Sequence, residues 1–209
     1  MNKKQLEIIL SQLREPEFPK PNLEQYTITG NLASQILNLT YLHGDIKDKI
    51  VFDFGTGSGR LAIGAAMLGA KAVVGVDIDK SVIKIAKENL KQHEEYLSKK
   101  LPVHFAICDI KNWFAKADTV IQNPPFGIQT RHADRLFLEA ALRSGKRIYT
   151  LHKNGYKKTR EFITKFVEDR GGEIEQIIKF KFSIPYMFKF HKKPKVSYKV
   201  DLYIIGKEI

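Results

Sequence analysis

The sequence predicts an α/β fold with a mostly parallel, doubly wound sheet and helices on both of its faces. From residue 50 onward, short apolar runs typical of buried strands alternate with longer runs whose apolar residues recur every three or four positions, as in amphipathic helices. Strands that alternate with helices are joined by crossovers, which place consecutive strands parallel. The chain has 209 residues, 43% of them hydrophobic, which is the size and balance of one globular domain.

The first 45 residues are expected to form a helical extension that packs on the α/β domain, residues 46–209. Apolar residues at three- and four-residue steps predict a short helix over residues 2–13 and a second helix over residues 32–42. Three prolines between residues 16 and 21 favour extended chain between these helices, because proline fixes φ and disfavours helix in the residue before it.

The elements of the main domain follow in order. Apolar runs predict parallel strands at residues 50–54, 72–76, 103–107, 119–122 and 147–151. Helical periodicity predicts helices around residues 61–68, 83–90, 136–142 and 162–167. The last part differs, because apolar and polar residues alternate over 178–182 and, less strictly, over 198–204. This pattern predicts an antiparallel hairpin that closes the sheet, with a basic, aromatic connection around residues 185–194.

The charge of the chain is strongly positive and unevenly distributed. Lysine and arginine number 35 against 23 acidic residues, a formal net charge of +12. Residues 140–160 and 176–200 each contain seven cations and no carboxylate. Such segments create local positive fields that suit contact with a phosphate backbone, and the alternative is a solvated lysine face.

Several classes of protein are excluded by composition. A single cysteine, Cys108, leaves no internal disulfide and no multi-cysteine zinc site, and the six histidines show no metal-ligand spacing. There is no run of about 18 apolar residues, so no membrane-spanning helix is expected. The N-terminus has no apolar signal-peptide core, so a cytoplasmic location is expected.

A glycine-rich turn follows the first predicted strand. In Asp53-Phe54-Gly55-Thr56-Gly57-Ser58-Gly59-Arg60, glycines at alternate positions allow a sharp turn and close approach to a ligand, although a purely structural turn would show the same pattern.

Asp77, about twenty residues beyond the turn, is placed to accept hydrogen bonds from both ribose hydroxyls of an adenosine group. Nicotinamide cofactors and S-adenosylmethionine both contain adenosine. Because the dinucleotide pattern requires glycine where Arg60 stands, a cofactor without pyrophosphate fits better. Asp109, after the third strand, is placed to accept from the adenine amino group.

The most specific signal is Asn123-Pro124-Pro125-Phe126, which ends the fourth predicted strand. Two prolines stiffen the backbone between an amide and an aromatic ring. The Asn123 side-chain oxygen and the Pro124 carbonyl oxygen are two acceptors for a planar amino group, and the Phe126 ring is suited to stack on the base that carries it. The alternative is a Pro-Pro turn that merely closes a loop.

Taken in order, Asp-x-Gly-x-Gly-x-Gly, Val-Asp-Ile-Asp and Asn-Pro-Pro-Phe resemble the class I S-adenosylmethionine-dependent N6-adenine methyltransferases. Four segments (Leu23–Tyr26, Asn123–Gly127, Leu151–Lys153 and Lys189–Lys193) resemble more narrowly the methyltransferase-like-five family, whose members methylate N6 of one adenosine in small-subunit ribosomal RNA. The resemblance spans about Leu23 to Leu202. It implies a Rossmann-like class I fold, S-adenosylmethionine as cofactor, ribosomal RNA as partner, and catalysis at Asn123, Pro124, Pro125 and Phe126.

The resemblance also implies a set of contacts, carried over residue by residue. Those to the cofactor are Gln25, Gly55, Gly57, Ser58, Arg60, Asp77, Ile78, Asp109 and Ile110, together with either Ile28 or Thr29. Those to RNA are Lys153, Lys189, His191, Lys192 and Lys193. The chain departs from the family at Thr27-Ile28-Thr29-Gly30, where a Pro-Thr pair is common, so Thr29 would have to supply its hydroxyl from a shifted position. Arg60 also stands where a smaller apolar residue is expected.

The resemblance implies a further partner, and three other functions are alternatives to it. The resemblance implies a small zinc-containing activator protein that extends the sheet, and residues 103–107 are a plausible edge strand for it. A protein glutamine N5-methyltransferase would use a similar loop, usually with tyrosine as the aromatic, and would leave the basic segments unexplained. A DNA adenine N6-methyltransferase would need a separate target-reading domain, for which this chain has no sizeable segment. A non-catalytic RNA-binding module would need only the basic, aromatic tail.

Overall fold

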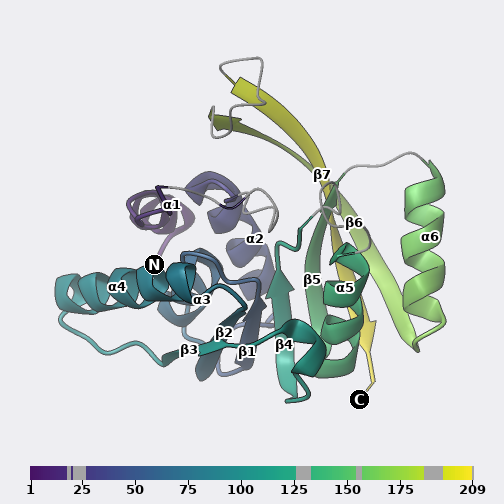
Figure 1. The fold of residues 1–209 in the computed structure, drawn as a ribbon, viewed down its shortest axis with the longest axis horizontal. Coiled ribbons are helices and arrows are strands. Elements are labelled where there is room, and N and C mark those ends of the chain that lie inside the picture. The colour runs from purple at the N-terminus through teal and green to yellow at the C-terminus, as the bar shows by residue number, and fades with distance from the viewer. Residues whose placement is uncertain (18–19, 21–26, 126–132, 154–156, 186–194, 209) are drawn as a thin grey trace.

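A computed structural model describes residues 1–17, 20, 27–125, 133–153, 157–185 and 195–208, and Figure 1 shows the fold. Seven strands form one sheet: β1 (Ile50–Phe54), β2 (Ala72–Asp77), β3 (Val103–Ile107), β4 (Ala117–Gln122), β5 (Gly145–Lys153), β6 (Gly172–Pro185) and β7 (Lys195–Lys207). Their order is β3-β2-β1-β4-β5-β7-β6, in which β1 to β5 pair in parallel and β7 is antiparallel to both neighbours. The predicted α/β sheet with an antiparallel C-terminal hairpin is therefore confirmed.

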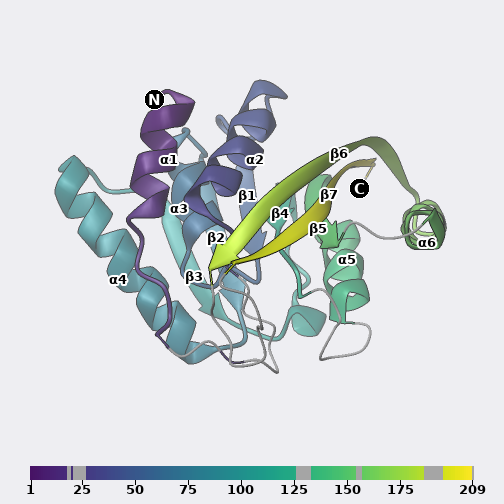
Figure 2. The same cartoon turned by 90° about the horizontal axis from the view of Figure 1, so that it is seen from above.

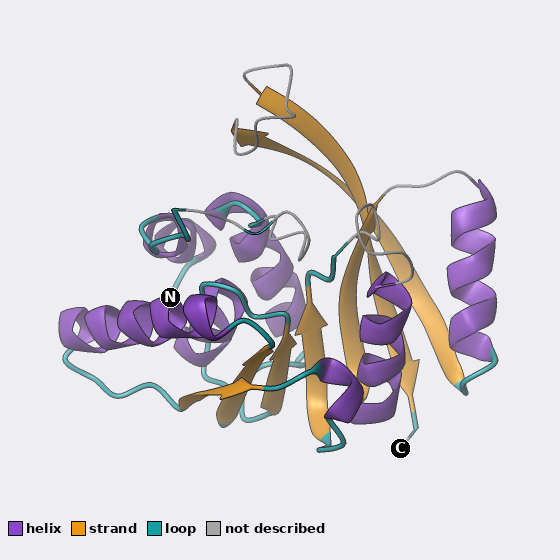
Figure 3. Cartoon of the chain, viewed as in Figure 1, coloured by secondary structure: helices purple, strands orange, loops and turns teal. Residues whose placement is uncertain are grey.

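The helices divide between the two faces of the sheet, as Figures 2 and 3 show. The helices are α1 (Lys3–Ser11), α2 (Gly30–Leu42), α3 (Arg60–Met67), α4 (Lys80–Leu97), α5 (Ala133–Ser144) and α6 (Lys157–Glu168), with a short 3₁₀ turn, η2, at Ile110–Asn112. One core contains side chains of α1, α2 and α3 packed on the sheet, and the other contains side chains of α5 and α6. Because helices cover both faces, four of the five residues of β1 are buried.

The N-terminal helices are part of the first core. Leu6 and Leu10 of α1 lie in the same cluster as Ile36 of α2 and as Val51 and Ile121 of the sheet. Helix α1 begins with a capping box, in which the Asn2 side chain accepts from the backbone N–H of Gln5 and the Gln5 side chain accepts from that of Asn2. Packing of α1 on the domain agrees with the expectation for this segment, and the division of the chain at residue 45 stays a prediction.

The carboxyl ends of the parallel strands meet at one edge of the sheet, and the hairpin extends beyond that edge. The pairing of β5 with β7 ends at Lys153 and Val200. From Lys181 opposite Lys199 to Pro185 opposite Lys195, the described residues of β6 and β7 pair only with each other. We call this two-stranded part, residues 181–185 and 195–199, the arm; it is the projecting hairpin at the top of Figure 1. The predicted connection at residues 186–194 lies outside the described residues.

Among the residues that the structure describes, no helix has both the length and the apolar character needed to cross a membrane.

Replacing Leu10 by alanine should lower the free energy of unfolding by about 2–5 kcal/mol, because it removes a buried side chain from the main core. Ile8 on the same helix is 49% exposed, and Ile8→Ala should change stability by less than about 0.5 kcal/mol. Urea unfolding of both variants measures the difference. Equal, small effects would show that α1 is not part of the cooperative unit.

Candidate functional site

A cavity of about 250 Å³ opens at the carboxyl edge of the sheet. Its walls come from the turns after β1, β2, β3 and β4, from the start of α5, and from the segment between α1 and α2. Of the residues predicted to bind a cofactor or act in catalysis, those lining it are Gly55, Gly57, Ser58, Arg60, Asp77, Ile78, Asp109, Ile110, Asn123 and Pro125. Folding therefore gathers most of the predicted site around one cavity.

The glycine turn uses backbone conformations that other residues rarely adopt. Gly55, Gly57 and Gly59 have φ of 68°, 52° and 84°. The backbone N–H groups of Gly55 and Thr56 donate to the carbonyl oxygen of Val76 at 2.8 and 3.0 Å, which ties the turn to the end of β2. The turn is thus held in place by the neighbouring strand.

Asp77 and Asp109 form part of the wall beside this turn. The Asp77 carboxylate accepts from the backbone N–H of Gly57 and of Asp79, each at 3.0 Å. Burial raises the pKa of Asp77, and these backbone donors oppose the rise. Asp109 begins η2 by accepting from the backbone N–H of Lys111 at 3.0 Å. The wall therefore offers carboxylate acceptors for hydroxyl or amino groups.

Asp53, at the end of β1, also lines the cavity and was given no role in the sequence analysis. Its Oδ2 accepts from the Thr56 hydroxyl at 2.7 Å and from the Ala62 backbone N–H at 3.0 Å. Its Oδ1 is buried and has no hydrogen-bond partner within the described part of the chain. Burial raises the pKa of Asp53 to about 7. A buried carboxyl with one uncommitted oxygen suits a cationic or amine group of a ligand.

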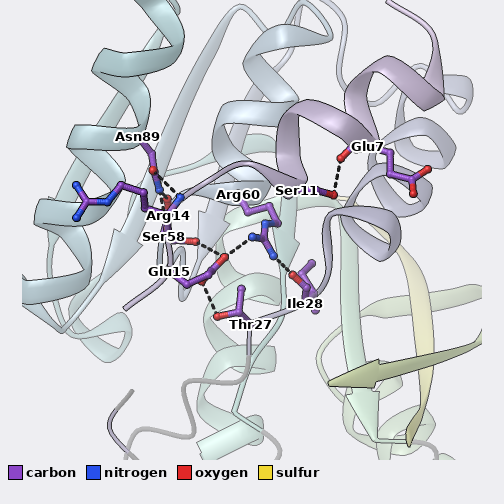
Figure 4. Close-up of polar contacts among 9 residues, drawn as sticks. All are labelled: Glu7, Ser11, Arg14, Glu15, Thr27, Ile28, Ser58, Arg60 and Asn89. Carbon is purple, nitrogen blue, oxygen red and sulfur yellow. Dashed lines mark hydrogen bonds and ion pairs between the residues drawn. The ribbon is translucent and has the colours of Figure 1, made fainter. Parts of the chain in front are cut away.

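Arg60 fastens the N-terminal segment over the glycine turn. Only 8% of Arg60 is exposed, and its guanidinium donates to the backbone oxygen of Ile28 and to the carboxylate of Glu15 (Figure 4). Glu15 also accepts from the hydroxyls of Thr27 at 2.8 Å and Ser58 at 3.3 Å. The ion pair satisfies an otherwise costly buried charge and explains why arginine stands where a smaller residue was expected. Whether Arg60 also contacts a cofactor stays a prediction.

Asn89 of α4 also holds the N-terminal segment in place through hydrogen bonds. Its Nδ2 donates to the backbone oxygens of Arg14 at 3.0 Å and Ser58 at 2.9 Å, and its Oδ1 accepts from the backbone N–H of Arg14 at 3.0 Å (Figure 4). Thr29, by contrast, caps α2 by accepting from the Leu32 backbone N–H, and it is not among the residues that line the cavity. Thr27 and Ile28 line the cavity instead.

The Asn123-Pro124-Pro125 segment lies directly against the glycine turn. A Cβ atom placed on Gly55 would lie 3.0 Å from the Phe137 ring and 4.0 Å from the carbonyl oxygen of Asn123. Asn123 and Pro125 line the cavity, and Pro124 is buried. Glycine at position 55 is favoured by its φ of 68° and by the close Phe137 ring, while the Asn123 oxygen lies at ordinary contact distance from the added Cβ. Gln25 and Phe126, which were also predicted to belong to the site, lie outside the described residues.

The basic residues of the site lie toward the arm. Lys153 is exposed at the end of β5, on the same edge as the cavity. Lys181 and Lys199 are exposed and directly opposite each other on the arm. The other predicted RNA contacts, Lys189, His191, Lys192 and Lys193, lie outside the described residues.

Asp53→Asn tests the charge of the buried carboxyl. Between its usual pKa of 3.8 and its folded value of about 7, the folded protein holds a proton that the unfolded chain has lost. The contribution of Asp53 to the free energy of unfolding therefore falls as pH rises, by about 3 kcal/mol from pH 5 to pH 8. Urea unfolding at both pH values should show the parent losing that much stability relative to Asp53→Asn. If the parent and Asp53→Asn differ in stability by the same amount at both pH values, the raised pKa of Asp53 is contradicted.

Comparison with known proteins gives matches over the whole chain. A family model described as ribosomal protein L11 methyltransferase (PrmA) matches residues 29–124. The uncharacterized protein MJ0284 of Methanocaldococcus jannaschii is 42% identical, over 99% of this chain and 95% of that protein. The rRNA N(6)-adenosine-methyltransferase METTL5 of Danio rerio is 38% identical, over 96% of this chain and 97% of that protein. The crystal structure of PH1948 from Pyrococcus horikoshii superposes with a TM-score of 0.89 at 39% identity, covering 100% of this chain and 99% of that one.

Proposed function

Because this chain belongs to the family of class I S-adenosylmethionine-dependent methyltransferases that includes METTL5, we propose that it methylates N6 of an adenosine in small-subunit ribosomal RNA. The observation that carries the proposal is that Asn123 and Pro125 line the same cavity of about 250 Å³ as the glycine turn and Asp77. Groups suited to a cofactor and groups suited to the acceptor amine thus face one cavity, which is what direct group transfer requires.

The residues around the cavity fit S-adenosylmethionine, which supplies an electrophilic methyl group on a sulfonium ion. The uncommitted, buried Oδ1 of Asp53 suits the cationic amine of the methionine part. The Asp77 carboxylate suits the ribose hydroxyls, and Asp109 with Ile110 suits the adenine. The backbone of Gly55, Gly57 and Ser58 lets the cofactor approach closely.

The Asn123-Pro124-Pro125 segment acts on the target amine by accepting hydrogen bonds from its two N–H groups. The Asn123 side-chain oxygen accepts one of these hydrogen bonds and the Pro124 carbonyl oxygen accepts the other, while Phe126 stacks on the adenine ring. An exocyclic adenine nitrogen is a weak nucleophile because its lone pair is delocalised into the ring. Two acceptors favour a pyramidal nitrogen whose lone pair points toward the methyl donor. Catalysis then comes from positioning and electrostatics.

RNA, as the acceptor, is supported by the charge of the arm. Lys181 and Lys199 lie directly opposite each other, and like charges in such a cross-strand pair repel. A phosphate backbone would neutralise that repulsion, and Lys153 extends the positive surface toward the cavity. A base held in a paired stem would have to be flipped out at a cost of a few kcal/mol, so an unpaired adenosine is the favoured target.

Labelled-methyl transfer to small-subunit ribosomal RNA, DNA and total protein, run side by side, tests the proposed function. Label in an N6-methyladenosine of the RNA is the expected result. Label mainly in DNA, or in protein glutamine, would overturn the choice of acceptor. Absence of transfer to all three, with S-adenosylmethionine bound, would favour a binding module.

Asn123→Ala should reduce methyl transfer to background, because the target amine loses one of its two acceptors, while the affinity for S-adenosylmethionine stays within about twofold of the parent. Asp77→Ala should do the reverse and weaken cofactor binding, because it removes the acceptor for the ribose. Calorimetric titration with S-adenosylmethionine and single-turnover transfer separate the two effects. Parental transfer by Asn123→Ala would show that its amide has no role in the reaction.

We also propose that a small zinc-containing activator protein adds a strand to β3. This strand lies at the edge of the sheet with β2 as its neighbour, and Ile107 near its end is 52% exposed. Sedimentation of the mixed chains should give a heterodimer, and Ile107→Asp should weaken it. Ile8→Asp is the control, because Ile8 is 49% exposed on α1. Two independent species for the parent would contradict the proposal.

A further inference from the structure

A row of buried polar side chains crosses the sheet directly behind the catalytic segment. Gln122 ends β4 and pairs in register with Thr150 of β5, and His152 pairs with Asp201 of β7. All four residues are at most 4% exposed. The preceding positions on the same face of these strands, Val120 of β4 and Ile148 of β5, are apolar core residues. The core thus changes from apolar to polar where the site begins.

Three of these side chains, Gln122, Thr150 and His152, form a continuous hydrogen-bonded chain. The Gln122 amide donates from Nε2 to the Thr150 hydroxyl oxygen at 2.9 Å. The same hydroxyl oxygen lies 3.0 Å from Nε2 of His152, which is hydrogen-bond distance. Burial lowers the pKa of His152 to about 4, although nearby Asp201 opposes this, so the imidazole is neutral and has one donor and one acceptor nitrogen.

The outer end of the chain is fixed to the rest of the protein. The His152 ring packs edge-on against Tyr203, with ring centroids 5.4 Å apart. Beside it, Asp201 accepts two hydrogen bonds from Arg160 of α6, at 2.8 and 3.0 Å. His152 is therefore held by β7, and β7 is held by α6.

The strand pairs of β4 end one residue before Asn123. The pairing of β4 with both neighbours ends at Gln122, which is opposite Phe54 of β1 and Thr150 of β5. Asn123 is the next residue and has left the ladder. A rotation of the backbone at Gln122 would move Asn123 and would also break the bond from Gln122 to Thr150. Burying polar groups is costly unless they are hydrogen-bonded, whereas a bonded chain fixes orientation in a way that apolar packing does not.

We propose that the Gln122–Thr150–His152 chain sets the orientation of the Asn123-Pro124-Pro125 segment, so that Thr150 and His152 are positioning residues for methyl transfer. This inference rests on the proposed role of that segment in catalysis. Neither side chain lines the cavity or touches the reacting atoms. Loss of the chain should therefore lower kcat and leave cofactor binding unchanged.

Thr150→Val removes the hydroxyl with little change of shape. It should lower kcat by at least about tenfold, because small misplacements of catalytic groups are costly, while the Kd for S-adenosylmethionine stays within about twofold. Thr150→Ser keeps the hydroxyl and should restore most of the rate. Thr119→Val is the matched control: Thr119 is also fully buried, and its hydroxyl donates to the Asp45 backbone oxygen at 2.7 Å, toward the other end of β4. It should lose comparable stability and keep the parental kcat.

A double-mutant cycle checks that Gln122 and Thr150 act through one bond. Gln122→Met should lower kcat by about as much as Thr150→Val, and the double variant should lose little more than either. The Gln122→Met variant alone serves as the test if Thr150→Val does not fold. Parental kcat in Thr150→Val or Gln122→Met, or an equal loss of kcat in Thr119→Val, would overturn the proposal. If the parent methylates an acceptor other than RNA, the same comparison is made with that acceptor, so failure of the proposed function is seen separately.

Discussion

The parallel pairing of β1 with β2 and β4 is the constraint on which the site depends. Phe54, the last residue of β1, is opposite Val76 on one side and Gln122 on the other. The residues that follow these positions are Gly55, Asp77 and Asn123, so the glycine turn, the Asp77 carboxylate and the Asn123-Pro124-Pro125 segment leave the sheet at the same level. Hydrogen bonds from the turn to Val76 and Asp77 then fix its backbone. The site is thus a consequence of strand register, and its turn uses positive φ values that favour glycine.

The N-terminal segment completes the cavity through interactions that do not involve the sheet. Glu15 and Asn89 connect this segment to the glycine turn and to α4, and Arg60 supplies the buried positive charge that Glu15 needs. Thr27 and Ile28 thereby become part of the cavity wall. Removing one partner of such a buried pair leaves the other charge uncompensated, so the wall and the turn depend on each other.

Charge is segregated between the cavity and the arm. Three carboxylates, those of Asp53, Asp77 and Asp109, line the cavity beside Lys111 and the Glu15-paired Arg60, although the chain as a whole carries a net charge of +12. Lys153, Lys181 and Lys199 place positive charge on the edge and the arm. An acidic lining suits a cofactor that carries a sulfonium and an amine, and a basic surface suits a polyanionic acceptor. The carboxylates of the cavity and the lysines of the arm thus lie on different parts of one edge.

The sequence by itself determined the order of strands and helices, the antiparallel hairpin, the glycine turn and the position of the Asn-Pro-Pro segment. These features depend on periodicity and turn chemistry, which act between residues close together in the chain. Only the tertiary structure decided that Arg60 pairs with Glu15, that Asn89 holds Arg14, that Asp53 lines the cavity with an uncommitted oxygen, and that Gln122 is bonded to Thr150. The bonded partners are 28 to 75 residues apart, so no local pattern brings them together. They meet because the register of the sheet and the packing of α1 and α4 place them in contact, and burial then makes each hydrogen bond necessary.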